Sequence, residues 1–324
     1  MQFTDEQVRQ FDFLESIFFA QTRDRQEQLE ARKLRLAHYT TAENAVNIIR
    51  NKTMWLRDTQ CMSDYSEVMH GYTQLLEYFD TEGKRDKFIK ALNQCAPACG
   101  EMALQRFDDW WAHIRTESYV CCLSEHEAGK EDSLGRLSMW RAYGANFGVA
   151  IILRPPRPYS AVPLNVMLSP VEYFSKESSW RLLDHLIDRV ERNQIELKKL
   201  PPELLTLSAY RMLVIAALSL KHPAFEEERE WRLIHLPFEN PSIFVKQEIV
   251  SIKGVPQKIY KIPLENYPSD GISGVSIPDL LDRIIIGPAQ FVGPIFSSLI
   301  EVLLEVGVEE PHKKIIFSQI PLRT

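Results

Sequence analysis

Residues 226–234 of the chain read EEEREWRLI, and from Glu228 onward charged and apolar side chains alternate. An alternation with a period of two is typical of a β-strand, so the sequence predicts a strand here. Side chains two residues apart lie on the same face of a strand. We therefore expect the carboxylates of Glu228 and Glu230 to lie side by side, with Arg232 and Ile234 following them on that face.

Two neighbouring carboxylates repel each other unless their surroundings use the charge. Paired carboxylates suit glycoside chemistry, because one can stabilise an oxocarbenium-like transition state while the other handles a hydroxyl or an acceptor. A run of charges just before Trp231 is also typical of a solvated strand edge. Arg232 would either pair with the acids or contact phosphate groups of a ligand, and we favour the ion pair.

The rest of the chain alternates between strand and helix patterns. Strands are predicted at 36–40, 118–124, 146–153, 244–252, 257–262, 283–286 and 314–317, and helices at 4–33, after Thr41, from Ser63 through Ile114, at 176–199, at 202–220 and at 292–304. Lys253-Gly254 predicts a hairpin turn between two of the strands. We expect an α+β fold with a helical arm at 1–34 and a single domain at 35–324, with helical insertions around 64–116 and 176–220.

The composition excludes several classes of protein. The chain has 324 residues, 45% hydrophobic and 25% charged, which is typical of a folded globular protein. Its net charge of −6 gives no global positive field that would hold it on nucleic acid or an anionic membrane. The N-terminus lacks the basic flank and apolar core of a signal peptide, and there is no long uninterrupted apolar run. We expect a cytoplasmic protein with no membrane partner.

The cysteines and the known short motifs exclude several kinds of site. Five cysteines are an odd number, which suits reduced thiols, and Cys95 and Cys99 lack nearby ligands to complete a zinc set. We therefore expect no metal. The chain has no glycine-rich dinucleotide loop, phosphate-loop lysine, nucleophile elbow or His-Glu-x-x-His helix. Hydride transfer, ATP hydrolysis, serine hydrolysis and zinc proteolysis are not supported.

Other side chains of chemical interest are ordinary structural residues when each is taken alone. The strand at 36–40 places His38 and Thr40 on one face of the sheet. A lone strand histidine is usually a satisfied structural residue, and Trp140 alone is typical of a core. The glycine-ended turn after residue 138 aims Trp140 and Tyr143 in nearby directions. Only the combination with the two acids indicates a site.

The motifs occur in an order that resembles a known family. They are His38-Tyr39-Thr40 with Glu43, Ser63-Asp64 with Glu67, Met139-Trp140 with Tyr143-Gly144, Glu228-Arg229-Glu230-Trp231-Arg232, Ile286-Gly287-Pro288 and Ser318-Gln319-Ile320-Pro321-Leu322-Arg323. The ordered set resembles domain-of-unknown-function family 2971 from about Leu36 to Arg323. That family in turn resembles the ADP-ribosyltransferase superfamily, in particular its His-Tyr-Glu branch.

The resemblance implies a fold with a split antiparallel sheet and a site for NAD as substrate. His38 would hydrogen-bond the NAD ribose, with Tyr39 and Thr40 beside it. Tyr143 or Trp140 would stack on the nicotinamide ring.

The resemblance also implies roles for the remaining candidates. Glu230 would stabilise the oxocarbenium ion and hold a ribose hydroxyl, while Glu228 would orient or deprotonate the acceptor. Ser124 is an alternative to Tyr143 at the middle position of the branch. The family commonly has Asn-Asp where this chain has Ser63-Asp64.

These implications give three functional hypotheses. The first is an NAD-dependent ADP-ribosyltransferase or NAD glycohydrolase that acts on an unknown protein or nucleic acid; by analogy with superfamily members, it would be a bacterial toxin or an anti-phage effector. The second is a non-catalytic module that binds a nucleotide or a protein in the same cleft. The third concerns the N-terminal helix, whose Phe11, Leu14 and Phe18 form an apolar stripe that would dock a partner or a second copy.

Overall fold

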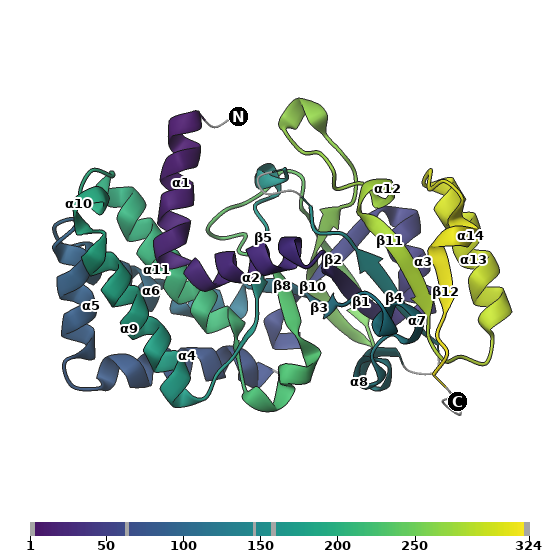
Figure 1. The fold of residues 1–324 in the computed structure, drawn as a ribbon, viewed down its shortest axis with the longest axis horizontal. Coiled ribbons are helices and arrows are strands. Elements are labelled where there is room, and N and C mark those ends of the chain that lie inside the picture. Colours follow the sequence, from purple (N-terminus) through teal and green to yellow (C-terminus); the bar gives the residue numbers. More distant parts are fainter. Residues whose placement is uncertain (1–3, 62–64, 145–146, 157–159, 321–324) are drawn as a thin grey trace.

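A mixed α+β architecture with a mostly antiparallel sheet is present in the computed structural model, which describes residues 4–61, 65–144, 147–156 and 160–320. Figure 1 shows a helical half beside a sheet-containing half, with α1 in the helical half and β12 at the far edge of the sheet.

The described strands alternate with helices along the chain. They are β1 (Arg35–Thr41), β2 (Thr53–Asp58), β3 (Tyr119–His126), β4 (Gly148–Leu153), β5 (Met167–Pro170), β6 (Glu172–Tyr173), β7 (Leu220–Lys221), β8 (Glu230–His235), β9 (Lys246–Ile252), β10 (Val255–Pro263), β11 (Leu281–Ile286) and β12 (Ile315–Phe317).

The longer helices gather in the helical half of the molecule and on one face of the sheet (Figure 1). The described α-helices are α1 (Asp5–Phe18), α2 (Ala20–Ala31), α3 (Ala42–Asn51), α4 (Tyr65–Asp80), α5 (Lys84–Asn93), α6 (Cys99–Thr116), α7 (Lys130–Leu134), α8 (Leu137–Met139), α9 (Lys176–Arg192), α10 (Gln194–Leu197), α11 (Pro202–Ser219), α12 (Ile277–Leu280), α13 (Val292–Glu305) and α14 (Pro311–Lys314). A π-helix at Trp140–Gly144 and a 3-10 helix at Pro223–Glu228 border the candidate site.

The main sheet runs β12-β11-β4-β1-β3-β2-β10-β9, and β8 and β5 join it through β3. Its ladders are antiparallel except for the parallel pair β11 and β12. A separate parallel pair joins β6 to β7.

The sheet splits at one edge of β3. Because β8 pairs with residues 119–124 of β3 along one edge, the other edge must hold both β1 and β2. On that edge β1 pairs with residues 124–126 and β2 with residues 119–120. The two strands therefore diverge beside Cys121–Leu123, and a gap opens between them.

The described residues form two large apolar cores and a third, smaller cluster of Ala37, Tyr39, Met139, Trp140, Ala150, Ile152 and Ile285. The helical core is built around α11, whose residues are buried on nearly all sides against α1, α4 and α6. This helix is long and apolar enough to cross a membrane by length and composition, but most of it is buried within the protein, as in the core helix of a folded domain. The second core lies between the sheet and the helices α3 and α13.

The N-terminal segment is two helices rather than the single helix predicted at 4–33. Thr4 forms the predicted capping box with Gln7, but the chain bends at Phe19, whose φ is −123°. Leu14 and Phe18 are buried against the helical core, so part of the apolar stripe is covered by this chain itself.

Most other predicted elements are present, and the hairpin turn at Lys253-Gly254 has the positive φ values of 51° and 82° that a tight hairpin requires. The prediction that Glu228 lies in a strand was wrong, because β8 begins at Glu230. Patterns in the sequence also missed β2, β5, β6 and β7, of which the last two are only two residues long.

The packing of α4 on α11 depends on a glycine. A Cβ atom at Gly71 would lie 2.3 Å from the carbonyl oxygen of Ala217, so Gly71→Ala must push the helices apart and should cost about 1–3 kcal/mol of unfolding free energy. Gly293→Ala is the matched control, since no atom lies within 4 Å of the added carbon and alanine favours a helix. Urea unfolding of both variants measures the difference. Equal stabilities would contradict this account of the interface.

Candidate functional site

A cleft of about 190 Å³ opens at the split of the sheet. Its walls are formed by Ala37, His38, Tyr39, Trp55, Arg57, Thr59, Val68, Val120, Cys121, Cys122, Leu123, Met139, Tyr143, Lys221, Glu228, Glu230 and Arg232. The cleft thus brings together His38, Tyr39, Tyr143, Glu228, Glu230 and Arg232 of the candidates predicted from sequence. Thr40, Ser124 and Trp140 are outside this lining.

Glu228 and Glu230 meet, although they do not share a strand. Glu228 ends a 3-10 helix, and Arg229 has a φ of 43° in the left-handed region, so the chain turns sharply before β8. Both carboxylates nevertheless contact the ammonium of Lys221, with N–O distances of 2.9 Å for Glu228 and 3.1 Å for Glu230. The two carboxylates are thus brought together by a shared ion-pair partner, and not by a shared strand face as the sequence predicted.

Lys221 is the residue that sequence reasoning missed. Its side chain is 2% exposed, and besides binding both acids its ammonium lies 4.7 Å from the centre of the Phe225 ring. A buried ammonium needs partners because desolvation disfavours its charge. The signal available in the sequence was a lysine directly after the long apolar helix pattern. The structure shows that the chain is still buried at this position.

Glu230 is buried and fully engaged. Its oxygens accept from Arg232 Nε at 2.7 Å, from Arg232 Nη2 at 3.3 Å and from Lys221 Nζ at 3.1 Å. Burial alone would raise the pKa of this carboxyl, but Arg232 and Lys221 outweigh it and lower the pKa to about 2. Glu230 is therefore ionised at neutral pH, and each of its two oxygens already accepts a hydrogen bond from a cation.

Glu228 is the more accessible acid. Its side chain is 19% exposed, against 5% for Glu230. Among the described residues its carboxylate contacts Lys221 through Oε2, while Oε1 has no protein partner. Glu228 is therefore the acid with an oxygen left for a ligand in the cleft.

The ion pair predicted for Arg232 is present. The side chain is 4% exposed, and its Nη1 donates to the carbonyl of Leu218 while the other nitrogens bind Glu230. The Arg232 guanidinium therefore links the Glu230 carboxylate to the end of α11.

His38 marks the point where β1 leaves β3. Its Nδ1 lies 3.1 Å from the carbonyl oxygen of Cys122, so Nδ1 carries the proton and donates. Burial lowers the pKa of the imidazole, partly offset by this bond. The ring is neutral at pH 7, so Nε2 is left as the acceptor of a side chain that lines the cleft.

Of the aromatic candidates, Tyr143 is exposed in the cleft, whereas Trp140 is part of the apolar core. Tyr143 lies in the π-helix and is 41% exposed at the cleft. Trp140 is buried, donates its indole N–H to the carbonyl of Leu134 and packs edge-on against Tyr39 at 4.9 Å. Stacking on a ligand is thus open to Tyr143, while Trp140 supports the wall behind it.

Thr40 and Ser124 have local structural partners. Thr40 accepts from the side-chain amide of Asn44 at 3.3 Å. Ser124 donates to the carbonyl of Glu228 at 2.5 Å and accepts from Arg136 at 2.6 Å. Ser124 therefore fixes the backbone of an acid instead of lining the cleft.

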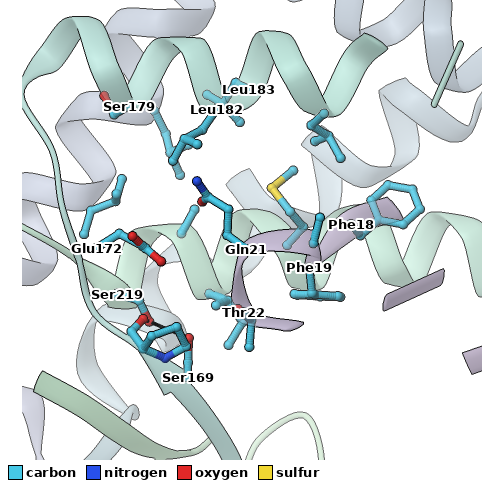
Figure 2. A pocket seen from close by; sticks show the side chains of 18 of the residues that line it. Phe18, Phe19, Gln21, Thr22, Ser169, Glu172, Ser179, Leu182, Leu183 and Ser219 are labelled. Carbon is cyan, nitrogen blue, oxygen red and sulfur yellow. Dashed lines mark hydrogen bonds between the residues drawn. The ribbon is translucent and has the colours of Figure 1, made fainter. Parts of the chain in front are cut away.

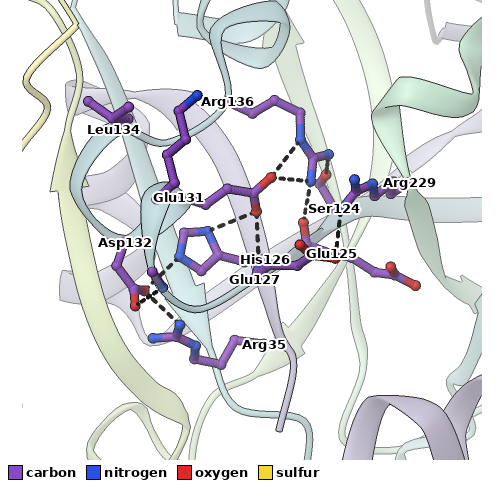
Figure 3. A network of polar contacts seen from close by, with 12 residues as sticks. Arg35, Ser124, Glu125, His126, Glu127, Glu131, Asp132, Leu134, Arg136 and Arg229 are labelled. Atoms are coloured by element: carbon purple, nitrogen blue, oxygen red, sulfur yellow. Dashed lines mark hydrogen bonds and ion pairs between the residues drawn. The ribbon is translucent and has the colours of Figure 1, made fainter. Parts of the chain in front are cut away.

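Arg136 is a second residue that sequence reasoning did not place at the site. Figure 3 shows its guanidinium in a network with Glu131 and Ser124. Its Nη1 also donates to the carbonyls of Glu227 and Glu228, each at 3.0 Å. Because a guanidinium is rigid and planar, these bonds fix the turn that aims Glu228 at Lys221.

The same network extends away from the cleft. His126, which is fully buried, contacts Asp132 through Nε2 at 3.0 Å, and Asp132 in turn pairs with Arg35 at 2.6 Å (Figure 3). Burial lowers the pKa of His126 despite its acidic neighbours. The network ties α7, which follows β3, to the first strand.

The two acids should differ in their effect on stability. Glu230→Gln leaves Lys221 and Arg232 buried without their full counter-charge and should cost about 3–5 kcal/mol of unfolding free energy at pH 7. Glu228→Gln removes one contact of a partly exposed side chain and should cost about 1 kcal/mol or less.

Urea unfolding across pH tests this difference. Because the pKa of Glu230 is lowered from 4.5 to about 2, its advantage over glutamine is present above pH 4.5 and is lost as the pH falls towards 2. A Glu230→Gln variant as stable as Glu228→Gln at pH 7 would overturn the assignment of Glu230 as the anchored acid.

Parts of two of the motifs that carry the resemblance lie outside the described residues, namely Ser63-Asp64 and Pro321-Leu322-Arg323.

No curated protein and no solved structure matches the chain. A family model described as "Protein of unknown function (DUF2971)" matches residues 139–233. The match begins at Met139, before Tyr143, and ends at Leu233, after both acids and Arg232, so it supports the resemblance to that family over the part of the chain that carries these site residues.

Proposed function

We propose that this protein cleaves the nicotinamide–ribose bond of NAD and transfers ADP-ribose to a macromolecule or to water. The observation that carries the proposal is the convergence of His38, Tyr143 and the Glu228/Glu230 pair, from three distant parts of the sequence, in one cleft at a split in the sheet. These residue types in one cleft are the set that the resemblance to the ADP-ribosyltransferase superfamily implies.

Tyr143 and His38 each offer an interaction that suits the nicotinamide riboside end of NAD. The exposed Tyr143 ring offers a face for the nicotinamide, and His38 Nε2 offers an acceptor for a ribose hydroxyl. A cleft of about 190 Å³ suits the nicotinamide and its ribose, with the rest of the dinucleotide lying along the surface.

The geometry favours Glu228 as the acid that contacts the ribose. The resemblance gives this role to Glu230, but both oxygens of Glu230 already accept from Arg232 or Lys221. Glu228 has a free oxygen and a position held by Arg136. We assign Glu228 to the ribosyl cation and Glu230 to the anchoring of Lys221.

The reaction then balances without an added redox partner. The bond from the anomeric carbon to the pyridinium nitrogen breaks, and nicotinamide leaves with the bonding electrons as a neutral molecule. Glu228 stabilises the positive charge left on the ribosyl group. Water or a nucleophile of the acceptor adds to the anomeric carbon, and its proton passes to the Glu228 carboxylate. We place this reaction in the cytoplasm, where NAD is available.

One observation favours a non-catalytic binding module as the second candidate. The two acids are matched by the two cations Lys221 and Arg232, so the cluster has little net charge with which to stabilise a developing cation. In that case NAD or another nucleotide would bind in the cleft and leave it intact.

Nicotinamide release from NAD distinguishes the two candidates. We expect purified protein, alone or with added cellular protein, RNA and DNA, to release nicotinamide. Glu228→Gln should lower the rate about 100-fold to 1,000-fold, because glutamine keeps the shape but removes a charge that acts in the transition state. Glu301→Gln, an exposed glutamate on α13, is the control and should not change the rate.

Two outcomes would reject parts of the proposal. If NAD is not consumed with any acceptor, catalysis fails, and binding measured by calorimetry then tests the module. If Glu230→Gln is folded and loses the activity while Glu228→Gln keeps it, the assignment of the two acids must be reversed.

Tyr143 supplies a separate test of substrate placement. Tyr143→Phe keeps the ring and should keep KM for NAD within about threefold, whereas Tyr143→Ala should raise KM about tenfold or more, since stacking on a base contributes about 1–3 kcal/mol. Steady-state kinetics of both variants give the comparison. Equal KM values for the two would show that the ring does not contact the nicotinamide.

A further inference from the structure

A second cavity, of about 100 Å³, lies where the N-terminal helices meet the helical half of the molecule. It is bounded by the junction of α1 and α2, by α4, α9 and α11, and by the segment from Ser169 to Glu172. Figure 2 shows Leu182 and Leu183 on one side and Phe18 and Phe19 at one end. Apolar side chains thus form most of its wall.

Glu172 is the acidic side chain in this apolar lining. In Figure 2 its carboxylate points into the cavity, on the side towards Gln21. Among the described residues it has no hydrogen bond or ion pair, and Arg25, a cation whose charge acts on it, is bound to Glu125 at 2.5 Å. Burial raises the pKa of Glu172 to about 7. An unpaired carboxylate in such surroundings lowers the stability of the folded protein once it ionises.

The other groups around the cavity do not neutralise Glu172. Ser219 donates to Ser169 at 3.3 Å, so these two hydroxyls bond to each other. Arg189 also lines the cavity, but its Nε donates to the carbonyl of Ile17 at 2.9 Å, and its side chain is not paired with Glu172. The cavity therefore combines an apolar wall with the unpaired carboxylate of Glu172, while Arg189, the cation in the same lining, is held by the carbonyl of Ile17.

We propose that this cavity is a binding site for a small organic cation, a primary amine with an apolar body, whose ammonium pairs with Glu172. The apolar body would replace the contacts that the empty space lacks. The ammonium would supply the hydrogen bonds that the carboxylate lacks. This site is separate from the cleft at the sheet split, and the proposal does not depend on the reaction assigned there.

Three probes of equal length separate charge from apolar contact: n-hexylamine, 1-hexanol and hexanoate. The full-length protein is titrated with each probe at pH 6 and pH 8, and binding is followed by protein-observed NMR. Hexylamine stays protonated at both pH values, since alkyl amines titrate near pH 10. Glu172, with a pKa of about 7, is mostly protonated at pH 6 and mostly ionised at pH 8.

We expect hexylamine to bind about tenfold more tightly at pH 8 than at pH 6, and more tightly than hexanol at pH 8. In Glu172→Gln the amine should lose this advantage while hexanol binding is unchanged. Glu301→Gln, on the distant α13, should behave like the native chain.

Contrary results would overturn the proposal. If hexanoate binds most tightly, the cavity is a site for anions that pair with Arg189, and the proposed cation site is wrong. Equal binding of hexylamine and hexanol at pH 8, or no binding of any probe, would make the space a packing defect.

The stability of Glu172→Gln gives an independent check on the unpaired carboxylate. Because the folded-state pKa is raised from 4.5 to about 7, the native chain loses stability as the pH rises through this interval. The melting temperature of Glu172→Gln should therefore exceed that of the native chain at pH 8 and approach it near pH 4.5. A variant less stable than the native chain at pH 8 would show that Glu172 is paired, and the site would lose its basis.

Discussion

The burial of the Lys221 ammonium between Glu228 and Glu230 is the constraint on which the candidate site depends. A charge that is 2% exposed must be matched by nearby charges of the opposite sign, so the end of α11, the 3-10 helix and the start of β8 are held together. Arg232 completes the balance by binding Glu230 and the carbonyl of Leu218. Tyr173 adds a further link, because its hydroxyl accepts from the backbone N–H of Glu230.

The split of the sheet gives this charge cluster its cleft. Had either β1 or β2 run the full length of this edge of β3, backbone hydrogen bonds would have closed it beside Cys121–Leu123. Instead the imidazole of His38 satisfies the carbonyl of Cys122, and side chains from both diverging strands face the opening. Arg136 holds the turn before β8 in place, so the acids are fixed relative to the gap.

Periodicity in the sequence located most of the long helices and strands and the hairpin turn, because buried and exposed positions repeat regularly there, but it did not reveal the bend at Phe19 within the helix predicted at 4–33. It failed at the turn before β8, where Arg229 adopts a left-handed conformation that no alternation of charged and apolar residues reveals. Lys221 was missed because β7 is two residues long and its partner, β6, is separated from it by the three helices α9, α10 and α11. Trp140 and Ser124 were named from order in the sequence, and only the packing shows that they support the wall and the backbone.

The most direct test of the account is a crystal structure of the Glu228→Gln chain with NAD, in which slow turnover would preserve the substrate. The account predicts the nicotinamide ring against Tyr143 and the ribose within hydrogen-bond distance of residue 228 and His38. NAD bound outside this cleft, or a cleft that remains empty at millimolar NAD, would contradict the central claim.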